Sequence, residues 1–194
     1  MVKPTEGINN KSTYICGIDL ARTGKDQTAI VVLEQPPFNH PQKYIVHMEA
    51  LHTPDLMDAV GRVKQLNTLF KFTKIYVDET GLGAGVTDLL KEGLGHIVEG
   101  ITFTVKSKAE MFMNLKLLLQ NKTLMLPSYE EKSNPIYKKL IYQMMGINYR
   151  YNSQQHLLLS HDARGHDDLV CALALACSYF NMRRNIQRSY GIAG

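Results

Sequence analysis

The sequence predicts a single α/β domain built on a mixed β-sheet. Three apolar, strand-like segments follow one another near the N-terminus, and strand-like and helical segments alternate after them. Strands joined by short turns pair antiparallel, whereas strands separated by a helix pair parallel. The 194 residues, 44% hydrophobic and 21% charged, are sufficient for one substantial core but short for two.

The first half of the chain contains the three-stranded meander. We expect strands at residues 13–20, 28–34 and 43–51, because each is an apolar run bounded by turn-forming residues. Residues 1–12 are polar, and we expect them to be a leader or the remnant of an interdomain linker, with the domain at 13–194.

Helices and strands alternate in the remainder of the chain. A helix is expected from residue 54 to about 70, where apolar residues recur at helical spacing, and a buried strand at 74–78. Gly81, Gly83 and Gly85 predict a turn before a short helix. The later elements are a helix at 86–92, a strand at 97–104, a helix at 107–120, an extended piece at 123–126, a helix at 134–146, a hairpin of 149–151 with 156–159, and a buried helix from 167 to about 183. This order is that of the RNase H-like architecture, a mixed sheet with helices on both faces.

Separated aspartates are the main functional signal. Asp19 and Asp78 each end an apolar strand, and the pair Asp167–Asp168 opens the last helix. Each acid alone could be a turn or cap residue, but three acidic positions that each adjoin a buried element favour a joint role. Hard divalent cations prefer oxygen ligands, and two of them can cut phosphodiesters. The pattern predicts a nuclease that depends on Mg²⁺ or Mn²⁺.

Basic residues permit a polyanionic partner, since the net charge is +4. Lys106 and Lys108, just before a predicted helix, and Lys25, in the first turn, could meet a phosphate, although each is individually more typical of a solvated surface. Other candidates for a DNA-facing rim are Arg22, Lys132, Lys138, Lys139, Arg150 and Arg164.

Histidines and cysteines give weaker signals. His161 and His166 could bind zinc, but no cysteine accompanies them. His166 either supports a carboxylate or lies on the surface. The three cysteines all lie in apolar segments, which indicates buried thiols in a reducing compartment. No apolar run approaches membrane-spanning length and the N-terminus is polar, so we expect neither a transmembrane segment nor a signal peptide.

Four motifs over about residues 13–180 resemble those of the C-terminal nuclease domain of tailed-phage terminase large subunits, the motors that package viral DNA. They are Gly17-Ile18-Asp19, then Gly24-Lys25-Asp26 with Thr28-Ala29, then Val77 to Gly81 with Gly83, and Gly165 to Leu169 before an alanine-rich helix. The resemblance implies an endonuclease that cuts concatemeric double-stranded DNA with two Mg²⁺ or Mn²⁺ ions and little sequence specificity. It makes Asp19, Asp78, Asp167 and Asp168 the metal ligands.

The resemblance also implies partners. These are an N-terminal ATPase domain, whose phosphate-binding loop this sequence lacks, the portal and the small terminase subunit, all in the cytoplasm of an infected cell. A Holliday-junction resolvase of the same fold and a non-catalytic module that docks on DNA or the portal remain alternatives. An actin-like phosphotransferase would need a second lobe. The segment 148–166 could gate a DNA groove.

Overall fold

The central sheet of the computed structural model is the predicted mixed sheet. The structure describes residues 8–21, 27–38, 40–52, 55–80, 83–127, 134–151, 157–161 and 167–189. Six strands lie in the order β5-β4-β1-β2-β3-β6. The antiparallel meander consists of β1 (Thr13–Asp19), β2 (Thr28–Gln35) and β3 (Lys43–Leu51). The strands that pair parallel are β4 (Lys74–Asp78) with β1, β5 (Val98–Ile101) with β4, and β6 (Leu124–Met125) with β3.

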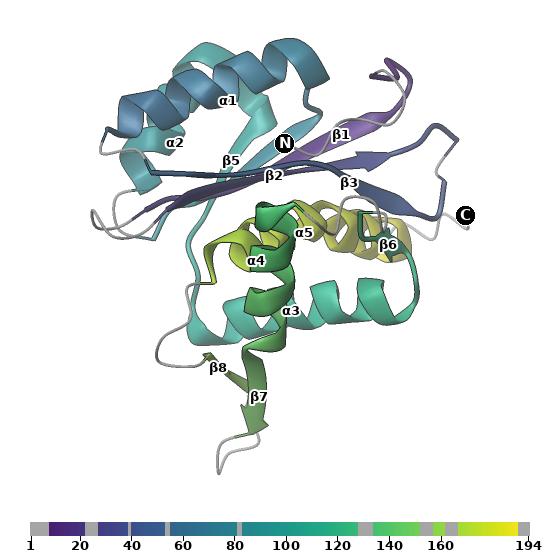
Figure 1. Cartoon of the computed structure of the whole chain (residues 1–194). Coiled ribbons are helices and arrows are strands. Elements are labelled where there is room, and N and C mark those ends of the chain that lie inside the picture. The colour runs from purple at the N-terminus through teal and green to yellow at the C-terminus, as the bar shows by residue number, and fades with distance from the viewer. Residues whose placement is uncertain are drawn as a thin grey trace.

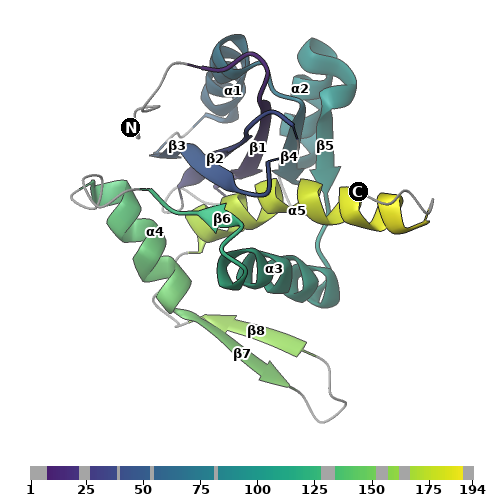
Figure 2. The same ribbon diagram turned by 90° about the vertical axis from the view of Figure 1, so that its right-hand side faces the viewer.

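Helices cover both faces of the sheet, as predicted (Figure 1). On one face lie α1 (Leu56–Phe70) and α2 (Gly83–Leu94), the latter followed by the short 3₁₀ helix η1 (Gly95–Ile97). On the other lie α3 (Val105–Gln120), α4 (Pro135–Met145) and α5 (Asp168–Ser189). The strands β7 (Ile147–Tyr151) and β8 (Leu157–His161) form a separate hairpin that projects away from the sheet (Figure 2).

Side-chain alternation along β1 divides the core into two layers. Cys16 and Ile18 pack with α1 and α2, whereas Ile15 packs with α3, α4 and α5. Gly17 lies on the α5 side as well, because a Cβ there would lie 2.0 Å from the carbonyl oxygen of Ala172. The absent side chain lets the backbone of α5 rest directly on β1, and this contact fixes the position of α5 beneath the sheet.

Two predicted boundaries were wrong for local reasons. Gly83 and Gly85 lie inside α2 and not in a turn, and a Cβ on Gly83 would lie 1.9 Å from the carbonyl oxygen of Asp78. The expected strand at 97–104 ends at Ile101. Thr104 instead caps α3, since its hydroxyl oxygen accepts a hydrogen bond from the Ser107 amide at 3.0 Å and the Ser107 hydroxyl accepts one from the Thr104 amide at 2.9 Å. The helix therefore begins two residues earlier than predicted.

Two further features agree with the sequence. Cys16, Cys171 and Cys177 are buried free thiols, and burial raises the pKa of each. In the part of the chain that the structure describes, no helix is long and apolar enough to cross a membrane. Residues 152–156, which include the connection of the predicted hairpin, lie outside the described residues.

Candidate active site

Asp19 and Asp78 lie side by side at one edge of the sheet. Their strands, β1 and β4, are adjacent and parallel, and Ile18 pairs with Val77 directly before the two acids. Asp78 is buried, and its Oδ1 accepts a hydrogen bond from the backbone N–H of Thr80 at 2.8 Å. Side chains alternate between the two faces of a strand. Asp19 therefore lies on the α5 side of β1, like Gly17 two residues before it, and Asp78 lies on the α5 side of β4, like Tyr76, which packs in the core beside α5. Both carboxylates therefore face the start of α5.

The first turn of α5 brings the other two acids to this edge. Asp167 directly precedes the helix, and its carbonyl oxygen accepts a hydrogen bond from the Cys171 amide at 2.8 Å. Asp168 is the first helical residue. The contact of α5 with Gly17, two residues before Asp19 in the chain, brings the start of the helix close to the end of β1. The fold thus gathers all four predicted acids from three separate segments.

The charges of these acids act on one another. The pKa of Asp19 is raised to about 8, first by burial and then by Asp78, Asp168 and Asp167 in that order, while Lys108 lowers it. A carboxylate that shares a partly desolvated site with other carboxylates binds a proton more readily, because the proton removes part of the repulsion. The raised pKa is evidence that the four acids occupy a single electrostatic site.

Lys108, one of the predicted supporting lysines, lies beside these acids. Its Nζ lies 3.2 Å from Oδ2 of Asp167 and donates a hydrogen bond to it, and it also lies 5.8 Å from the centre of the Phe112 ring. Burial lowers the pKa of Lys108, but Cys171, Asp167 and Asp19 raise it by more, so its net pKa lies above the usual value. Lys108 is therefore a cation at neutral pH.

The acids suit a hard divalent cation in donor chemistry. Carboxylate oxygens are the ligands that Mg²⁺, Mn²⁺ and Ca²⁺ prefer, and the repulsion recorded in the raised pKa of Asp19 is what a bound cation would relieve. Within the described ranges, no three acidic, histidine or cysteine side chains converge tightly enough to hold a metal ion. The acids share one edge without forming a complete coordination shell.

The other predicted site residues were not found beside the four acids, or they lie outside the residues that the structure describes. Lys106 is 86% exposed on α3 and pairs with Glu110 at 4.0 Å. The structure does not describe Lys25, Arg164 and His166, nor the rim candidates Arg22 and Lys132. His161 lies in β8, Lys138 and Arg150 are exposed, and Lys139 contacts Gln27.

Gln143 is a residue of the site that sequence reasoning missed. It is a buried residue of α4, and its Oε1 accepts a hydrogen bond from the backbone N–H of Leu169 at 3.0 Å. This bond ties α4 to the first turn of α5, next to the acid pair. Gln143 interrupts an otherwise apolar stripe in the sequence of α4, and a polar residue at such a position is the signal that could have identified it.

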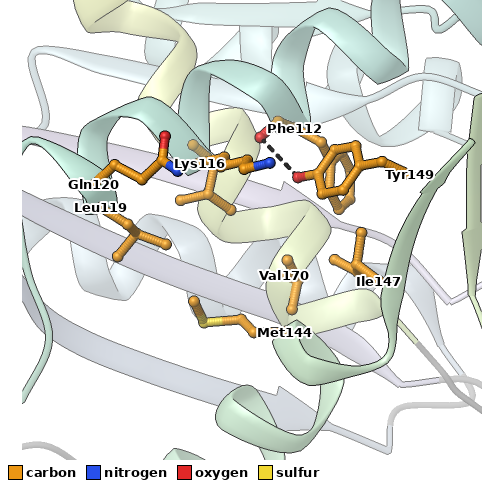
Figure 3. A pocket seen from close by; sticks show the side chains of 9 residues that line it. Phe112, Lys116, Leu119, Gln120, Met144, Ile147, Tyr149 and Val170 are labelled. Atoms are coloured by element: carbon orange, nitrogen blue, oxygen red, sulfur yellow. Dashed lines mark hydrogen bonds between the residues drawn. The ribbon is translucent and has the colours of Figure 1, made fainter. Parts of the chain in front are cut away.

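A cavity of about 290 Å³ lies next to the acid site, between α3, α4, β7 and the start of α5 (Figure 3). Tyr149 closes one side, where its hydroxyl donates to the carbonyl oxygen of Phe112 at 3.5 Å and its ring lies 4.7 Å from Nζ of Lys116. Among the described residues that line the cavity, none carries a carboxylate. It is therefore a separate, largely apolar space at the base of the hairpin.

Comparison with known proteins gives consistent matches. A family model described as a terminase RNase H-like domain matches residues 16–180. The large terminase subunit of Thermus virus P23-45 is 26% identical over 142 residues, which cover 70% of this chain and 26% of that protein. The corresponding protein of Thermus phage G20c is 25% identical over the same length. The chain thus spans about a quarter of these relatives.

Solved structures share the fold. The large terminase nuclease of phage G20c with bound magnesium superposes with a TM-score of 0.70 at 22% identity, covering 89% of this chain and 84% of that one. The nuclease domain of the large terminase subunit of bacterial virus Sf6, solved with manganese and beta-thujaplicinol, gives 0.67 at 14% identity, covering 87% and 89%.

Proposed function

The chain belongs to the family of terminase RNase H-like domains, and from this premise we propose that it is a divalent-metal-dependent endonuclease that cuts double-stranded viral DNA during genome packaging. The observation that carries the proposal is the gathering of four acids at one sheet edge, with the pKa of Asp19 raised by burial and by the three others. Perturbed acids of this kind are typical of catalytic sites.

Asp19, Asp78 and the pair Asp167–Asp168 are the residues that would hold the metal. Asp19 interacts electrostatically with each of the other three acids, so it would share the binding of the metal with all of them. Related nucleases were solved with magnesium, cobalt or manganese, which supports a divalent ion and leaves the choice of Mg²⁺ or Mn²⁺ to experiment. Bound there, the cations would activate water and stabilise the charge of the leaving 3′-oxygen.

Lys108 has two roles in this proposal. Its ion pair with Asp167 compensates part of the acidic charge and holds that carboxylate in place before substrate arrives. A cation at this position would also favour the negative charge that develops on the scissile phosphate. Because its pKa is raised, Lys108 supplies this charge throughout the neutral range.

The substrate and partners follow from the family. We propose concatemeric double-stranded DNA as substrate, cut with little sequence selectivity because phosphate contacts carry no sequence information. We further propose that residues 13–194 act as the nuclease domain beside an ATPase domain, with the portal and the small terminase subunit, in the cytoplasm of the infected cell. The products should carry 5′-phosphate and 3′-hydroxyl ends.

Plasmid cleavage tests the proposal. The wild-type protein is incubated with supercoiled plasmid in Mg²⁺, Mn²⁺ or EDTA, next to Asp19→Asn and the control Asp88→Asn, an exposed acid of α2. We expect cutting that requires metal, is almost abolished in Asp19→Asn and is unchanged in Asp88→Asn. A folded Asp19→Asn protein that cuts at the wild-type rate would refute the assignment. Cleavage of a linear duplex, compared with cleavage of an equal amount of four-way junction, distinguishes the terminase activity from junction resolution.

A further inference from the structure

A second polar cluster lies at the same edge and on the same face of the sheet as the acids. Asp19 pairs with Ala29 of β2, and Ala29 pairs with Ala50 of β3. Both alanines pack on the α5 side of the sheet. Gln27 lies two residues before Ala29, and His52 lies two residues after Ala50, so alternation places both side chains on that same face of the sheet. Two residues of strand correspond to roughly 7 Å, so the cluster adjoins the acid site.

Contacts between side chains join this cluster to α4. Lys139 Nζ donates a hydrogen bond to Oε1 of Gln27, and Nε2 of Gln27 contacts Nε2 of His52. A lysine ammonium can only donate, so the amide oxygen of Gln27 must face Lys139 and the amide nitrogen must face His52. Gln143 lies four residues after Lys139, and hence on the same face of α4, where it binds the first turn of α5. One face of α4 therefore lies along the acid-bearing edge.

Lys139 has a neutral partner and not a carboxylate. The lysines and the arginine with described ion pairs each face a carboxylate: Lys74, Lys91, Lys106, Lys108 and Arg62. Among the residues that the structure describes, no carboxylate lies within ion-pair distance of Lys139, and a neutral amide orients it instead. Its charge is thus held in position without being neutralised, as an anion site requires.

We propose that Lys139, oriented by Gln27, binds a backbone phosphate of DNA beside the acid site. Each strand of B-form DNA presents a phosphate about every 3.4 Å along the helix axis, so a duplex with one phosphate at the acids has neighbours within reach of this cluster. This inference rests on the proposed function and adds to it a residue that positions the substrate strand.

Binding of a duplex at several salt concentrations tests the inference. All variants carry Asp19→Asn so that the DNA stays intact in Mg²⁺, and fluorescence anisotropy reports Kd for two unrelated sequences. Lys139→Gln should weaken binding about five- to tenfold near 0.1 M salt and lower the salt slope by about 1, equally for both sequences. Lys139→Arg should keep the parental slope. The control Lys138→Gln removes an exposed charge about 100° around α4 and should change little.

The outcomes separate this inference from the proposed function. Lys139→Gln and Lys138→Gln could have the same Kd and the same salt dependence of binding while the wild-type protein still cuts DNA with metal. That result would refute the phosphate site at Lys139 and leave the proposed nuclease activity intact. If Lys139→Arg binds as poorly as Lys139→Gln, the contact is structural and the inference is overturned. Absence of DNA binding by the parent protein overturns both. Gln27→Met serves as a second variant if Lys139→Gln does not fold, and we expect a smaller loss in the same direction.

Discussion

Asp19→Asn should make the metal-free protein more stable at neutral pH, although it removes the central acid of the site. The folded protein raises the pKa of Asp19 from 3.8 to about 8, so between these values the folded state binds a proton that the unfolded state releases. Stability therefore falls as the pH rises through this window. Below pH 3.8 Asp19 is protonated in both the folded and the unfolded state, so it costs no stability. Above about pH 8 it is ionised in both states, and the protein loses the full amount of stability.

The size of the effect follows from the shift. Each pKa unit corresponds to about 1.36 kcal/mol, so a shift of about four units gives a full penalty of about 5–6 kcal/mol and about 4 kcal/mol at pH 7. Water entry and rearrangement of the acids reduce what is measured, so we expect Asp19→Asn to raise the free energy of unfolding by about 2–4 kcal/mol at pH 7. At pH 5 the gain should shrink to about 1–2 kcal/mol.

Urea denaturation in EDTA, followed by circular dichroism at pH 5, 6, 7 and 8, measures this directly. The wild-type protein should lose stability along the series relative to Asp19→Asn, and the two curves should diverge with increasing pH. Asp88→Asn, which removes an exposed carboxylate of α2, should run parallel to the wild type. A constant difference between wild type and Asp19→Asn across the four pH values would show that the acids do not repel one another, and the single electrostatic site would have to be abandoned.

Three further substitutions test the remaining parts of the site. Asp168→Asn should reduce cleavage more than Asp167→Asn, because Asp167 is engaged by Lys108 and Asp168 acts more strongly on Asp19; equal rates in plasmid assays would argue against this ranking. Gly17→Ala should lower the free energy of unfolding by about 3 kcal/mol or more, since its Cβ would overlap the backbone of α5. Gln143→Met leaves a buried amide of α5 without its acceptor and should cost about 1–3 kcal/mol; a melting temperature equal to that of the wild type would contradict the role of this bond.

The mixed sheet could be predicted because its signals are local. Apolar runs, turns and helical spacing identified the meander and the crossovers, and short-range rules then gave antiparallel pairing in the first and parallel pairing in the second. Which strands are neighbours, such as β4 beside β1, depends on long-range packing. The start of α3 and the glycines of α2 were misjudged because they depend on other contacts. Thr104 and Ser107 complete a cap only when the chain turns there, and Gly83 is required by the close approach of the Asp78 carbonyl, five residues earlier, which depends on how the backbone turns between them.

The acids could be predicted but their surroundings could not. A carboxylate that ends an apolar strand stands out in a sequence, and so does a lysine that opens a helix. Gln27 and His52 carry no such signal, since their importance comes from the register of β2 with β3 and from the position of α4. Lys139 was one of several rim candidates in the sequence, and only its contact with Gln27 distinguishes it from its neighbour Lys138.

Bringing the four acids together at one edge of the sheet costs free energy, and the packing of α5 offsets that cost. Every residue from Leu169 to Cys177 is buried, so the helix that carries Asp167 and Asp168 is also the most deeply packed helix described. Each large apolar side chain buried there contributes about 1.5–3 kcal/mol, so Leu169, Leu173 and Leu175 together contribute about 4.5–9 kcal/mol, more than the penalty of about 4 kcal/mol at Asp19 at pH 7. Placing two acids at the start of such a helix lets the fold hold them against their mutual repulsion. The packing of α5 thus keeps the acids together without a metal ion, as the proposed metal-dependent nuclease would require before a cation binds.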